Sequence, residues 1–447
     1  MRYIEEFSRK TPVMAETDVL VVGSGPSGLA AALASARQGV DTLLVERYGC
    51  FGGNITQAMV ESIGWYRHEK TIESDGIGRE FERETIRLAG QRCEPQSISQ
   101  VVEADIFKCA ADEMVEAAGV EKFLHCLGVE AIVHNDSVAG VITESKEGRR
   151  AILAKQVIDC TGDADIAYRA GASCHKPDKT ELEGVSVSFG CSGVNRQKFM
   201  SYIAENPATI GQWASQTSGK EDGLFSPYLS EPFARARENG EIPSDVLEGG
   251  YWSSLTDTGE ATYLNMVYML GLDPTNLKDL THAEITGRKQ AMLAIAALRK
   301  YTPGFENARL RTFGSSLGAR ESRKIVGRYY MTESDVRNQA AFSDSIGIFP
   351  EFLDAYGVVV IPTTGRYFQV PYGIMVPDGI DNLLVAGRCV SGDKISHAAL
   401  RQMMCCTVTG QGAGVAAAMA VKSGVTTREV NIAEVQSALQ KQGVRIA

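Results

Sequence analysis

The feature that most constrains this chain is a glycine-rich turn between a short apolar strand and an alanine-rich helix near its start. Residues 18–28 read Asp-Val-Leu-Val-Val-Gly-Ser-Gly-Pro-Ser-Gly, and a helical run over 29–38 follows. In this G-x-G-x-x-G pattern, Gly23 permits a tight turn, Gly25 lets the backbone approach a pyrophosphate, and Gly28 lets helix and strand pack closely. The helix start offers free N–H groups and a positive dipole end to phosphates.

A second predicted strand, over 41–45, supplies an acidic residue that fits the same site. Glu46 follows this strand, about 20 residues beyond the glycines, where a carboxylate accepts hydrogen bonds from a ribose diol. An isolated G-x-G-x-x-G arises by chance in a chain with 45 glycines. The full order of strand, glycines, helix, strand and acid is much more specific. We therefore predict an adenine dinucleotide site at this turn.

Length and composition restrict the class of protein around this site. With 447 residues, the chain can hold two or three domains. A net charge of -10 without a Lys/Arg cluster argues against nucleic-acid binding. The charged residues 1–10 do not resemble a secretory signal, and apolar runs such as 415–421 are shorter than the ~20 residues of a membrane span. Ten scattered cysteines without C-x-x-C spacing favour a reducing cytoplasm.

Hydrophobic periodicity predicts an α/β fold with two domains. A Rossmann-like domain, with a parallel sheet and a small antiparallel β-meander, is expected over 1–175 and again over 357–447. A more polar segment with more prolines, over 176–356, is expected to form an inserted α+β substrate domain. The predicted elements are helices over 76–90, 104–118, 281–301 (beginning with a Thr281–Glu284 capping box) and 409–423, and strands over 124–133, 138–144, 156–159 and 382–386.

Three later glycine-bearing segments favour FAD over a nicotinamide cofactor. A second strand–GxGxxG–helix unit, usual in a nicotinamide enzyme, is absent from the sequence, since the glycines of 410–414 lie inside a helix-forming run. Segments 52–53, 161–163 and 387–392 follow strands or loops and can converge on one long ligand. FAD stretched across the fold suits that arrangement better than NAD.

Further motifs are spread over nearly the whole chain. They are Val-Val-Gly-Ser-Gly-Pro-Ser-Gly (21–28), Glu-Arg-Tyr-Gly (46–49) with Gly-Gly (52–53), Val-Ile-Asp-Cys-Thr-Gly-Asp-Ala-Asp (157–165), Leu-Gly-Ala-Arg-Glu-Ser-Arg-Lys-Ile-Val-Gly (317–327), Asn-Leu-Leu-Val-Ala-Gly-Arg (382–388) and Gly-Gln-Gly-Ala-Gly (410–414). With them the chain resembles the FAD-dependent oxidoreductases of the glutathione-reductase-like superfamily. More narrowly, it resembles the branch related to the flavin subunits of fumarate reductase-type enzymes. The motifs are specific for fold and cofactor, not for substrate.

The resemblance implies which residues bind FAD. The glycine turn takes the pyrophosphate, Glu46 takes the adenosine ribose, and Val129 contacts adenine through its backbone. Residues 161–163 lie near the pyrophosphate, while the 387–388 turn and a helix start at 410–413 approach the flavin. A helix N-terminus aimed at the flavin would stabilise its anionic reduced form. The implied set is Gly23, Ser24, Gly25, Pro26, Ser27, Gly28, Glu46, Arg47, Gly52, Gly53, Asn54, Val129, Thr161, Gly162, Asp163, Gly387, Arg388, Gln411, Gly412 and Ala413.

Three residues are the candidates for catalysis, because the protein must hold a substrate and move a proton while the flavin exchanges the hydride. His397 suits a general acid or base; a structural histidine is the alternative. Arg401, one helical turn later, could bind a substrate carboxylate or form an ion pair. Arg320, in the Arg-Glu-Ser-Arg run 320–323, could recognise a carboxylate or help to join the two domains through salt bridges.

Other candidates carry less chemistry. His175 fits a loop residue better than a catalytic one. Cys50 could tether the flavin, and Cys405 and Cys406 could form a redox pair, although adjacent helical residues point about 100° apart and two packed cysteines are the preferred interpretation. The six dispersed histidines lack metal-ligand spacing, so we expect no metal site.

The sequence therefore predicts a cytoplasmic FAD-dependent oxidoreductase that transfers a hydride between flavin and a small organic substrate. It would act as a dehydrogenase, an oxidase or a double-bond reductase, with an external electron acceptor or donor and without nucleic acid or a membrane span. The alternatives are a flavin monooxygenase and a non-redox or structural flavoprotein subunit. A homo-oligomer could form through the long helix of the inserted domain and the loop at Trp252.

Overall fold

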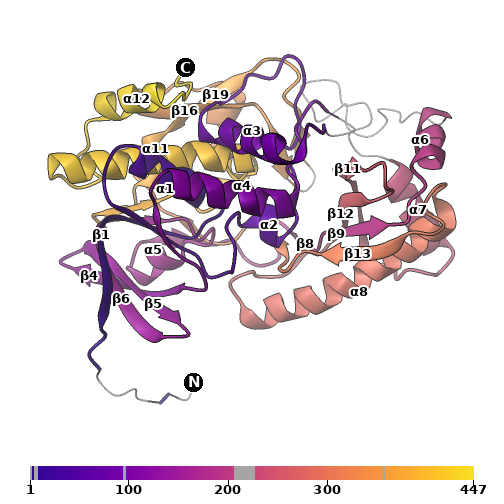
Figure 1. Ribbon diagram of the computed structural model, residues 1–447, viewed down its shortest axis with the longest axis horizontal. Coiled ribbons are helices and arrows are strands. Elements are labelled where there is room, and N and C mark those ends of the chain that lie inside the picture. Colours follow the sequence, from indigo (N-terminus) through magenta and orange to yellow (C-terminus); the bar gives the residue numbers. More distant parts are fainter. Residues whose placement is uncertain (1–2, 5–8, 94–96, 206–226, 356–357) are drawn as a thin grey trace.

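The chain forms two sheet-based units that lie side by side (Figure 1). The computed structural model describes residues 3–4, 9–93, 97–205, 227–355 and 358–447. One unit is a seven-stranded sheet with its helices, and the other is a five-stranded sheet covered by a long helix. The mixed α/β architecture with a mainly parallel sheet is the one predicted from the sequence.

The seven-stranded sheet has the order β3-β2-β1-β6-β5-β4, with β20 beside the end of β6. Strand β1 (Val13–Val22) lies parallel between β2 (Thr42–Val45) and β6 (Gly148–Asp159). Strand β3 (Glu121–Phe123) extends the parallel part beyond β2, and β20 (Leu383–Val385) extends it beyond β6. The carboxyl ends of β1, β2 and β20 are apolar and buried, as in sheets covered on both faces. Ligands of such sheets bind at the crevice outside these ends.

An antiparallel meander continues the sheet on the other side. Strands β4 (Leu127–His134) and β5 (Ser137–Ser145) form a hairpin, and β5 pairs with the first half of β6. The hairpin turns at Asn135 and Asp136, whose φ angles of +49° and +61° suit the short polar side chains that tolerate this region. The meander predicted from the sequence is therefore present.

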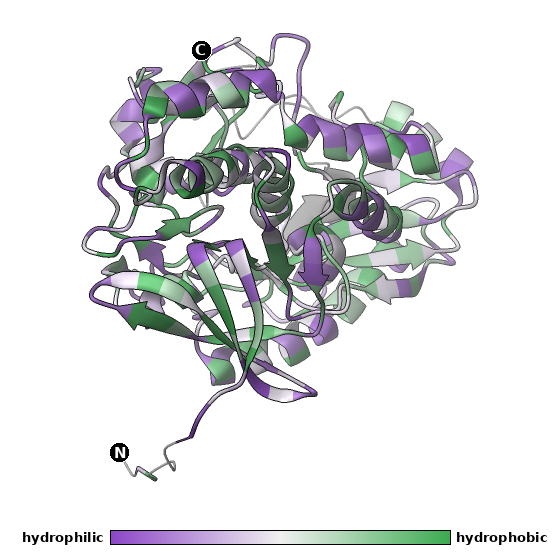
Figure 2. Ribbon diagram, turned by 60° about the vertical axis from the view of Figure 1, so that its left-hand side comes forward, coloured by the Kyte–Doolittle hydropathy of each residue, from purple (hydrophilic) through white to green (hydrophobic). Residues whose placement is uncertain are grey.

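Two glycine-bearing helices pack closely over the sheet. A Cβ on Gly410 of α11 (Met403–Ser423) would lie 2.1 Å from the Ser27 carbonyl oxygen of α1 (Pro26–Ala36), and one on Gly414 would lie 2.2 Å from the Ala31 carbonyl oxygen. Only glycine allows this approach. Figure 2 shows hydrophobic residues along the central strands and helices and hydrophilic residues on the periphery.

Helix α11 is the one described helix that is long and apolar enough to cross a membrane by length and composition. Within this fold, 89% of its most apolar window is buried inside the protein, so it is a core helix. The closing helix predicted over 409–423 is shorter than α11, which begins at Met403.

The second unit has a core of its own. Its sheet has the order β10-β12-β9-β13, with β11 also beside β12. The bounds are β9 (Phe189–Ser192), β10 (Leu247–Tyr251), β11 (Ser254–Leu255), β12 (Ala261–Tyr268) and β13 (Arg309–Phe313). Its buried apolar residues run from Val185 to Leu317, and those from Met331 onward belong to the core of the first unit. The predicted boundary at 356/357 falls outside the described residues, and the domain division stays a prediction. The membership of the two cores would place this boundary earlier, between Leu317 and Met331.

Two expectations for the second unit are wrong in detail. Helix α8 (Leu277–Tyr301) begins before Thr281, because the Asn276 side chain caps it by accepting hydrogen bonds from the N–H groups of residues 278 and 279. Glu284 instead accepts from the Leu317 N–H at 2.7 Å. Trp252 is only 4% exposed and packs edge-on against Phe199, so it is not available for a subunit contact.

Candidate functional site

The glycine turn has one closed side and one open side. Gly23 has a φ of +95°, and a Cβ there would lie 2.6 Å from the Cys160 carbonyl oxygen. A Cβ on Gly28 would lie 1.8 Å from the Gly23 carbonyl oxygen, so helix and strand touch there. A Cβ on Gly25, by contrast, would have only the Gly53 Cα within 4 Å, at 3.9 Å. The backbone at Gly25 is thus accessible to a ligand.

The start of α1 supplies hydrogen-bond donors at this open side. Pro26 occupies the first helical position, where its missing N–H costs nothing. The first hydrogen bond within the helix runs from the Leu29 N–H to the Gly25 carbonyl. The N–H groups of Ser27 and Gly28 therefore precede the helical ladder and, with the helix dipole, suit a phosphate group.

A second glycine pair lies against the first. The Gly52 N–H donates to the Ser24 carbonyl at 2.9 Å. A Cβ on Gly53 would lie 2.6 Å from the Gly25 Cα. Helix α2 (Asn54–Gln57) begins directly after this contact. The loop over 52–54 therefore borders the open side of the turn, as predicted for a segment that lines the cofactor.

Glu46 is buried and joined to the glycine turn. Its Oε2 accepts from the Ser24 N–H at 2.8 Å and from the Ser24 hydroxyl at 2.6 Å, and its Oε1 accepts from the Tyr48 N–H at 3.0 Å. A carboxylate has about four lone-pair sites, so acceptance from a ribose diol is compatible with these bonds. The exposed Arg47 places its guanidinium 4.7 Å from the centre of the Tyr48 ring.

Asp159, at the carboxyl end of β6, shapes the next loop. Its carboxylate accepts from the N–H and hydroxyl of Thr161 and from the N–H groups of Ile166 and Ala167. These bonds hold the turn through Gly162, whose φ is +82°, before α5 (Asp165–Arg169). The loop with Thr161, Gly162 and Asp163 is therefore rigidly presented at the same sheet edge as the glycine turn.

Asp163 links this loop to two distant segments. Its Oδ1 accepts from Arg388 Nη2 at 2.7 Å and from the Ser322 hydroxyl at 2.5 Å. Burial by itself would raise the pKa of Asp163, but Arg388, Ser322 and the charge of Arg47 outweigh it and hold that pKa below its ordinary value. Arg323 binds the Asp163 carbonyl at 2.9 Å and pairs with Asp165. Arg323 therefore forms a salt bridge, with Asp165, which is one of the two roles weighed for the 320–323 run.

The turn after β20 closes the crevice. Gly387 has a φ of +87°, and its N–H donates to the Thr409 hydroxyl of α11 at 3.0 Å. A Cβ there would lie 2.6 Å from Ser27 Oγ at the start of α1. The segments that begin at residues 23, 52, 161 and 387 therefore meet at one place, as the sequence analysis expected.

His397 lies in α10 (Lys394–Leu400) and is 1% exposed. Its Nε2 is 3.1 Å from the Arg320 carbonyl oxygen, while its Nδ1 is buried without a partner among the described residues. Burial lowers the pKa of the imidazole well below its ordinary value, and the positive charges of Lys324 and Arg401 lower it further. The ring is thus neutral at neutral pH.

Arg401 follows α10 directly, and its N–H donates to the His397 carbonyl at 2.9 Å. Its Nη2 binds the carbonyl of Asp354 in β17 (Leu353–Ala355) and pairs with the Asp354 carboxylate at 2.9 Å. Its Nε is buried without a partner among the described atoms. The candidate carboxylate-binding residue therefore already holds one protein carboxylate.

Arg320 lies on the other side of His397. Its Nη1 donates to the Ser186 hydroxyl at 2.6 Å and to the Gly184 carbonyl at 3.2 Å, and its guanidinium lies 4.8 Å from the Tyr268 ring centre. The Tyr268 hydroxyl donates to Glu183 at 3.2 Å. The structure thus brings all three predicted catalytic residues together, with side chains of the second unit beside them.

The comparisons with known proteins agree on the family. The sequence model of the family described as FAD dependent oxidoreductase matches residues 18–439, nearly the whole chain. The chain belongs to the FAD dependent oxidoreductase family. It is an enzyme of this family, and its cofactor is FAD. The narrower resemblance to the glutathione-reductase-like superfamily and its fumarate reductase-type branch stays a prediction.

Individual relatives are more distant. The thiamine thiazole synthase of Methanococcus maripaludis is 29% identical over 190 residues, 40% of this chain and 69% of that protein. The one from Saccharolobus solfataricus is 33% identical over 165 residues, 34% of this chain and 57% of that protein. A geranylgeranyl bacteriochlorophyll reductase-like structure from Thermoplasma acidophilum has a TM-score of 0.47 and 15% identity, covering 96% of this chain and 82% of that one. The chain thus spans 57 to 69% of the two curated relatives.

One part of the predicted FAD set needs correction. Gln411, Gly412 and Ala413 do not form a helix start, because α11 begins after Gln402 and these residues lie about two turns inside it. They are buried, and Gln411 accepts from the Ile77 N–H at 2.9 Å. In the structure they contact neighbouring elements, so their implied contact with FAD stays a prediction, and the positive dipole end lies at the first turn of α11 instead.

Several functional neighbours carry no sequence signal. Asp354, Tyr268 and the buried pair of Lys324 with Glu321 surround His397, Arg401 and Arg320. Asp354 and Tyr268 lie in β17 and β12, where neither spacing nor a motif marks them, whereas Glu321 and Lys324 belong to the 317–327 motif but have no pattern that singles them out. The side chains of Lys324 and Glu321 are 2% and 0% exposed. Glu321 also accepts from the Glu183 N–H, a contact far along the chain.

The remaining candidates differ in their surroundings. His175 is exposed in β7 (Cys174–His175). Cys50 is a half-buried free thiol that accepts from Gln57 Nε2 at 3.0 Å. Cys405 and Cys406 are buried free thiols, and burial raises the pKa of Cys406 to about 12. The observed state of the pair is therefore two packed thiols. Among the described residues, no group of three or more His, Cys, Asp or Glu could hold a metal ion.

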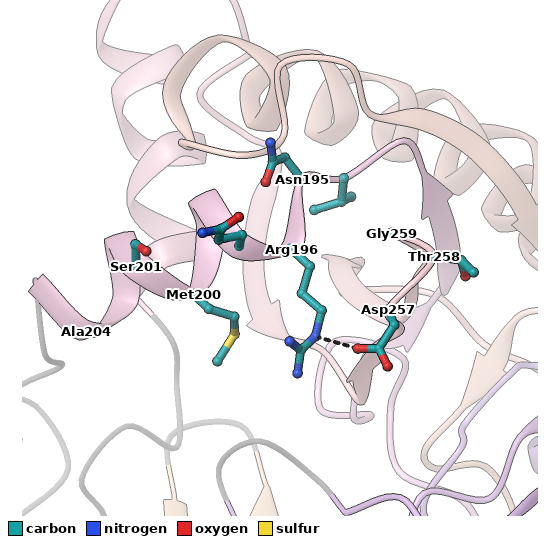
Figure 3. A pocket seen from close by; sticks show the side chains of 10 residues that line it. Asn195, Arg196, Met200, Ser201, Ala204, Asp257, Thr258 and Gly259 are labelled. Carbon is teal, nitrogen blue, oxygen red and sulfur yellow. Dashed lines mark ion pairs between the residues drawn. The ribbon is translucent and has the colours of Figure 1, made fainter.

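A cavity of about 680 Å³ lies elsewhere, between α6 (Arg196–Glu205) and the turn over 257–259 (Figure 3). Its charged residues, Arg196 and Asp257, form an ion pair at 3.4 Å with side chains 49% and 95% exposed. Helix α6 lies at the far end of the second unit from the glycine turn (Figure 1). The described lining of this cavity has a solvated ion pair and no buried titratable group. It therefore differs from the surroundings of His397, Arg401 and Arg320.

Proposed function

We propose that this enzyme transfers a hydride between FAD and a small organic substrate held beside His397, Arg401 and Arg320. The observation that carries the proposal is the meeting of four glycine-bearing segments at one place. Cys406 connects this place to the candidate side chains, because its Sγ lies 3.9 Å from a Cβ built on Gly387 and donates to the Arg401 carbonyl at 3.4 Å. In the proposed arrangement the pyrophosphate lies at the glycine turn, the ribose at Glu46, the adenine near Val129, and the flavin toward Arg388.

The residues present fit this cofactor. The backbone at Gly25 is open to a ligand because no Cβ fills the space there. The N–H groups at the start of α1 precede the hydrogen bonds of the helix and can donate to a phosphate group. The proposed FAD set is Gly23, Ser24, Gly25, Pro26, Ser27, Gly28, Glu46, Arg47, Gly52, Gly53, Asn54, Val129, Thr161, Gly162, Asp163, Gly387 and Arg388. Bound FAD supplies a two-electron hydride acceptor or donor.

The chain itself supplies binding and proton transfer. His397, neutral and with a free Nδ1, can accept a proton from a substrate group. Arg401, oriented by Asp354, contributes positive charge at the same place. Arg320 orients His397 through its carbonyl and keeps its guanidinium toward Tyr268. Burial of these groups keeps water away from the proton-transfer step.

The other functions weighed from the sequence have no specific observation in their favour. A monooxygenase would need a site for oxygen transfer, and a structural flavoprotein would not need an unpartnered buried imidazole. Thiazole synthesis is named for relatives that align with 40% of this chain or less, so it does not carry over. We further propose an external electron acceptor or donor, and a reducing compartment such as the cytoplasm, because all ten cysteines are free.

The decisive experiment separates FAD binding from folding. Gly25→Ala adds a Cβ in open space at an ordinary φ of −62°, so the chain should fold while losing most of its bound FAD. Gly318→Ala is the matched control, since its φ also lies outside the positive region and the nearest atom to the added Cβ is the Ala58 Cβ, at 3.5 Å. FAD content by absorbance, and circular dichroism for folding, report the result. A wild-type protein that stays colourless when offered FAD would overturn the proposal.

Reversible reduction then tests the chemistry. The FAD-loaded wild type should be bleached anaerobically by a small organic substrate, or, in the reductive direction, its reduced flavin should be reoxidised by one. Incorporation of an oxygen atom into the product, coupled to NAD(P)H use, would instead favour a monooxygenase.

A further inference from the structure

Within the part of the chain that the structure describes, two buried side-chain atoms one helical turn apart have no partner. They are Nδ1 of His397 and Nε of Arg401, and both belong to side chains that are otherwise firmly held. Residues at i and i+4 on a helix have Cβ atoms about 5–6 Å apart. The influence of the Arg401 charge on His397 agrees with this proximity.

The two atoms have opposite hydrogen-bonding character. A carbonyl oxygen only accepts, so His397 Nε2 carries the proton that it donates to the Arg320 carbonyl. In a neutral ring the other nitrogen is then a bare acceptor. Arg401 Nε carries a hydrogen and can only donate. The pair therefore offers one acceptor and one donor, one helical turn apart.

Leaving such groups unmatched is costly, because a buried donor or acceptor without a partner carries its full desolvation penalty. The ligand group that satisfies both through a single atom must donate one hydrogen bond and accept another. A carboxylate has no proton for Nδ1, and an ammonium group cannot accept from Nε. A hydroxyl group does both.

We propose that His397 and Arg401 form a subsite for a substrate hydroxyl group, so that the substrate class is a primary or secondary alcohol. This inference rests on the proposed function and specifies its direction. The hydroxyl proton goes to His397 Nδ1, and the hydride leaves the carbinol carbon for the bound FAD. The C–O bond becomes a carbonyl, and an external acceptor later removes the two electrons. Arg401 Nε–H stabilises the negative charge that develops on the oxygen.

The surroundings hold both groups in the required state. The Arg320 carbonyl fixes the imidazole tautomer, and Asp354 fixes the Arg401 guanidinium. The charged groups that act on His397 are Lys324, Arg401 and Arg388, and all three are cations, which favour the neutral ring. A proton taken from the substrate is therefore held only briefly on His397.

The first test needs no substrate. In a crystal structure of the FAD-loaded wild type, one water oxygen should stand within about 3.2 Å of both His397 Nδ1 and Arg401 Nε. A dry space, or two atoms satisfied separately by other groups such as the flavin ring, would overturn the subsite.

The second test uses matched ligands and variants. A panel of small alcohols, each with its deoxy analogue and its O-methyl ether, is mixed anaerobically with the FAD-loaded protein. Only the alcohols should bleach the flavin or perturb its spectrum on binding. His397→Gln keeps a donor for the Arg320 carbonyl but has no Nδ1, and Arg401→Lys keeps the charge but has no Nε–H.

Each variant should slow flavin reduction about 100-fold, the scale of general-base catalysis, and should weaken the spectral response to alcohols without releasing FAD. His134→Gln, an exposed control in β4, should behave as wild type. Reduction by amines or saturated acids, or unchanged reduction in His397→Gln, would overturn the inference while the hydride-transfer function stands. If water fills the subsite but no alcohol reduces the flavin, the alcohol assignment fails.

Discussion

The arginines on the two sides of the crevice are used differently. Arg388 and Arg323 are bound to Asp163 and Asp165, and no buried atom of these side chains lacks a partner among the described residues. Arg401 is also paired with a carboxylate, yet its Nε is buried and unsatisfied. The first arginines join separate segments of the chain, whereas Arg401 keeps a donor that the protein itself does not use.

This difference is the basis on which we treat the Arg388 and Arg323 pairs as structural and the Arg401 pair as part of the proposed ligand site. Both sides have arginine, carboxylate and burial in common. Only the side with His397 combines unsatisfied donors and acceptors, and buried polar groups in folded proteins are nearly always satisfied. Other buried side-chain atoms among the described residues, such as Arg67 Nη2, also lack a partner, so the two atoms at His397 and Arg401 are singled out by their place beside the proposed cofactor site.

The largest expected effect lies on the structural side. Arg388→Met leaves Asp163 partly buried without its cation, and the free energy of unfolding should fall by about 3 kcal/mol, because an unpaired buried charge is strongly destabilising. Urea unfolding of the FAD-free protein measures it. Arg311→Met breaks an exposed pair with Glu260 and should change stability by less than about 1 kcal/mol. Equal shifts in the two variants would remove the distinction drawn above.

The next effect is a pH dependence on the His397 side. The pKa of His397 is lowered in the folded state, so between that pKa and about 6.5 the unfolded chain binds more protons. The stability contribution is complete above pH 6.5 and is lost as the pH falls, by about 1.4 kcal/mol per pH unit. Urea midpoints of wild type and His397→Gln between pH 7.5 and 5.5 should converge as the pH falls. Parallel curves would show that His397 is not held neutral.

A smaller effect is expected from the residue that orients Arg401. Asp354→Asn removes the charge but keeps an acceptor, so Arg401 should stay in place with looser orientation. Flavin reduction by an alcohol that reduces the wild type should slow about tenfold through misalignment, with FAD affinity unchanged. Asp257→Asn, at a 95% exposed side chain, is the control. Loss of FAD in Asp354→Asn would assign Asp354 to cofactor binding instead.

The smallest effect is expected at the cavity of Figure 3. Arg196→Ala breaks a solvated ion pair with Asp257, which should cost less than about 1 kcal/mol. The rate of flavin reduction should equal that of wild type. A clear loss of rate would show that this outer cavity takes part in the reaction.

Local patterns in the sequence were sufficient for the first β-α-β unit. The glycine turn and Glu46 follow from short-range rules of backbone geometry, and both are present in the structure. The same holds for the Asn135–Asp136 hairpin, which lies outside this unit. The start of α11 was missed because its N-cap, Gln402, makes no side-chain cap and leaves no signal. Helix α8 was begun too late because Thr281 and Glu284 imitate a capping box.

The candidate site was predictable only in part for the same reason. His397 and Arg401 were found because their residue types suggest chemistry. Asp354 and Tyr268 were not, since their partners Arg401 and Arg320 lie far along the chain, and Lys324 was not, since its importance comes from burial. The unpartnered atoms themselves are a property of the assembled core and cannot be derived from spacing.

The double pairing of β6 has a consequence for how the enzyme is made. The second half of β6 pairs with β20, which is synthesised only after residue 382 and therefore after the whole five-stranded unit. Until then, the edge of the half-built sheet at residues 157–159 is without its neighbour and is open to pairing with other chains. We therefore expect nascent or truncated chains that end before β20 to depend on chaperones, and FAD to be captured only after synthesis is nearly complete.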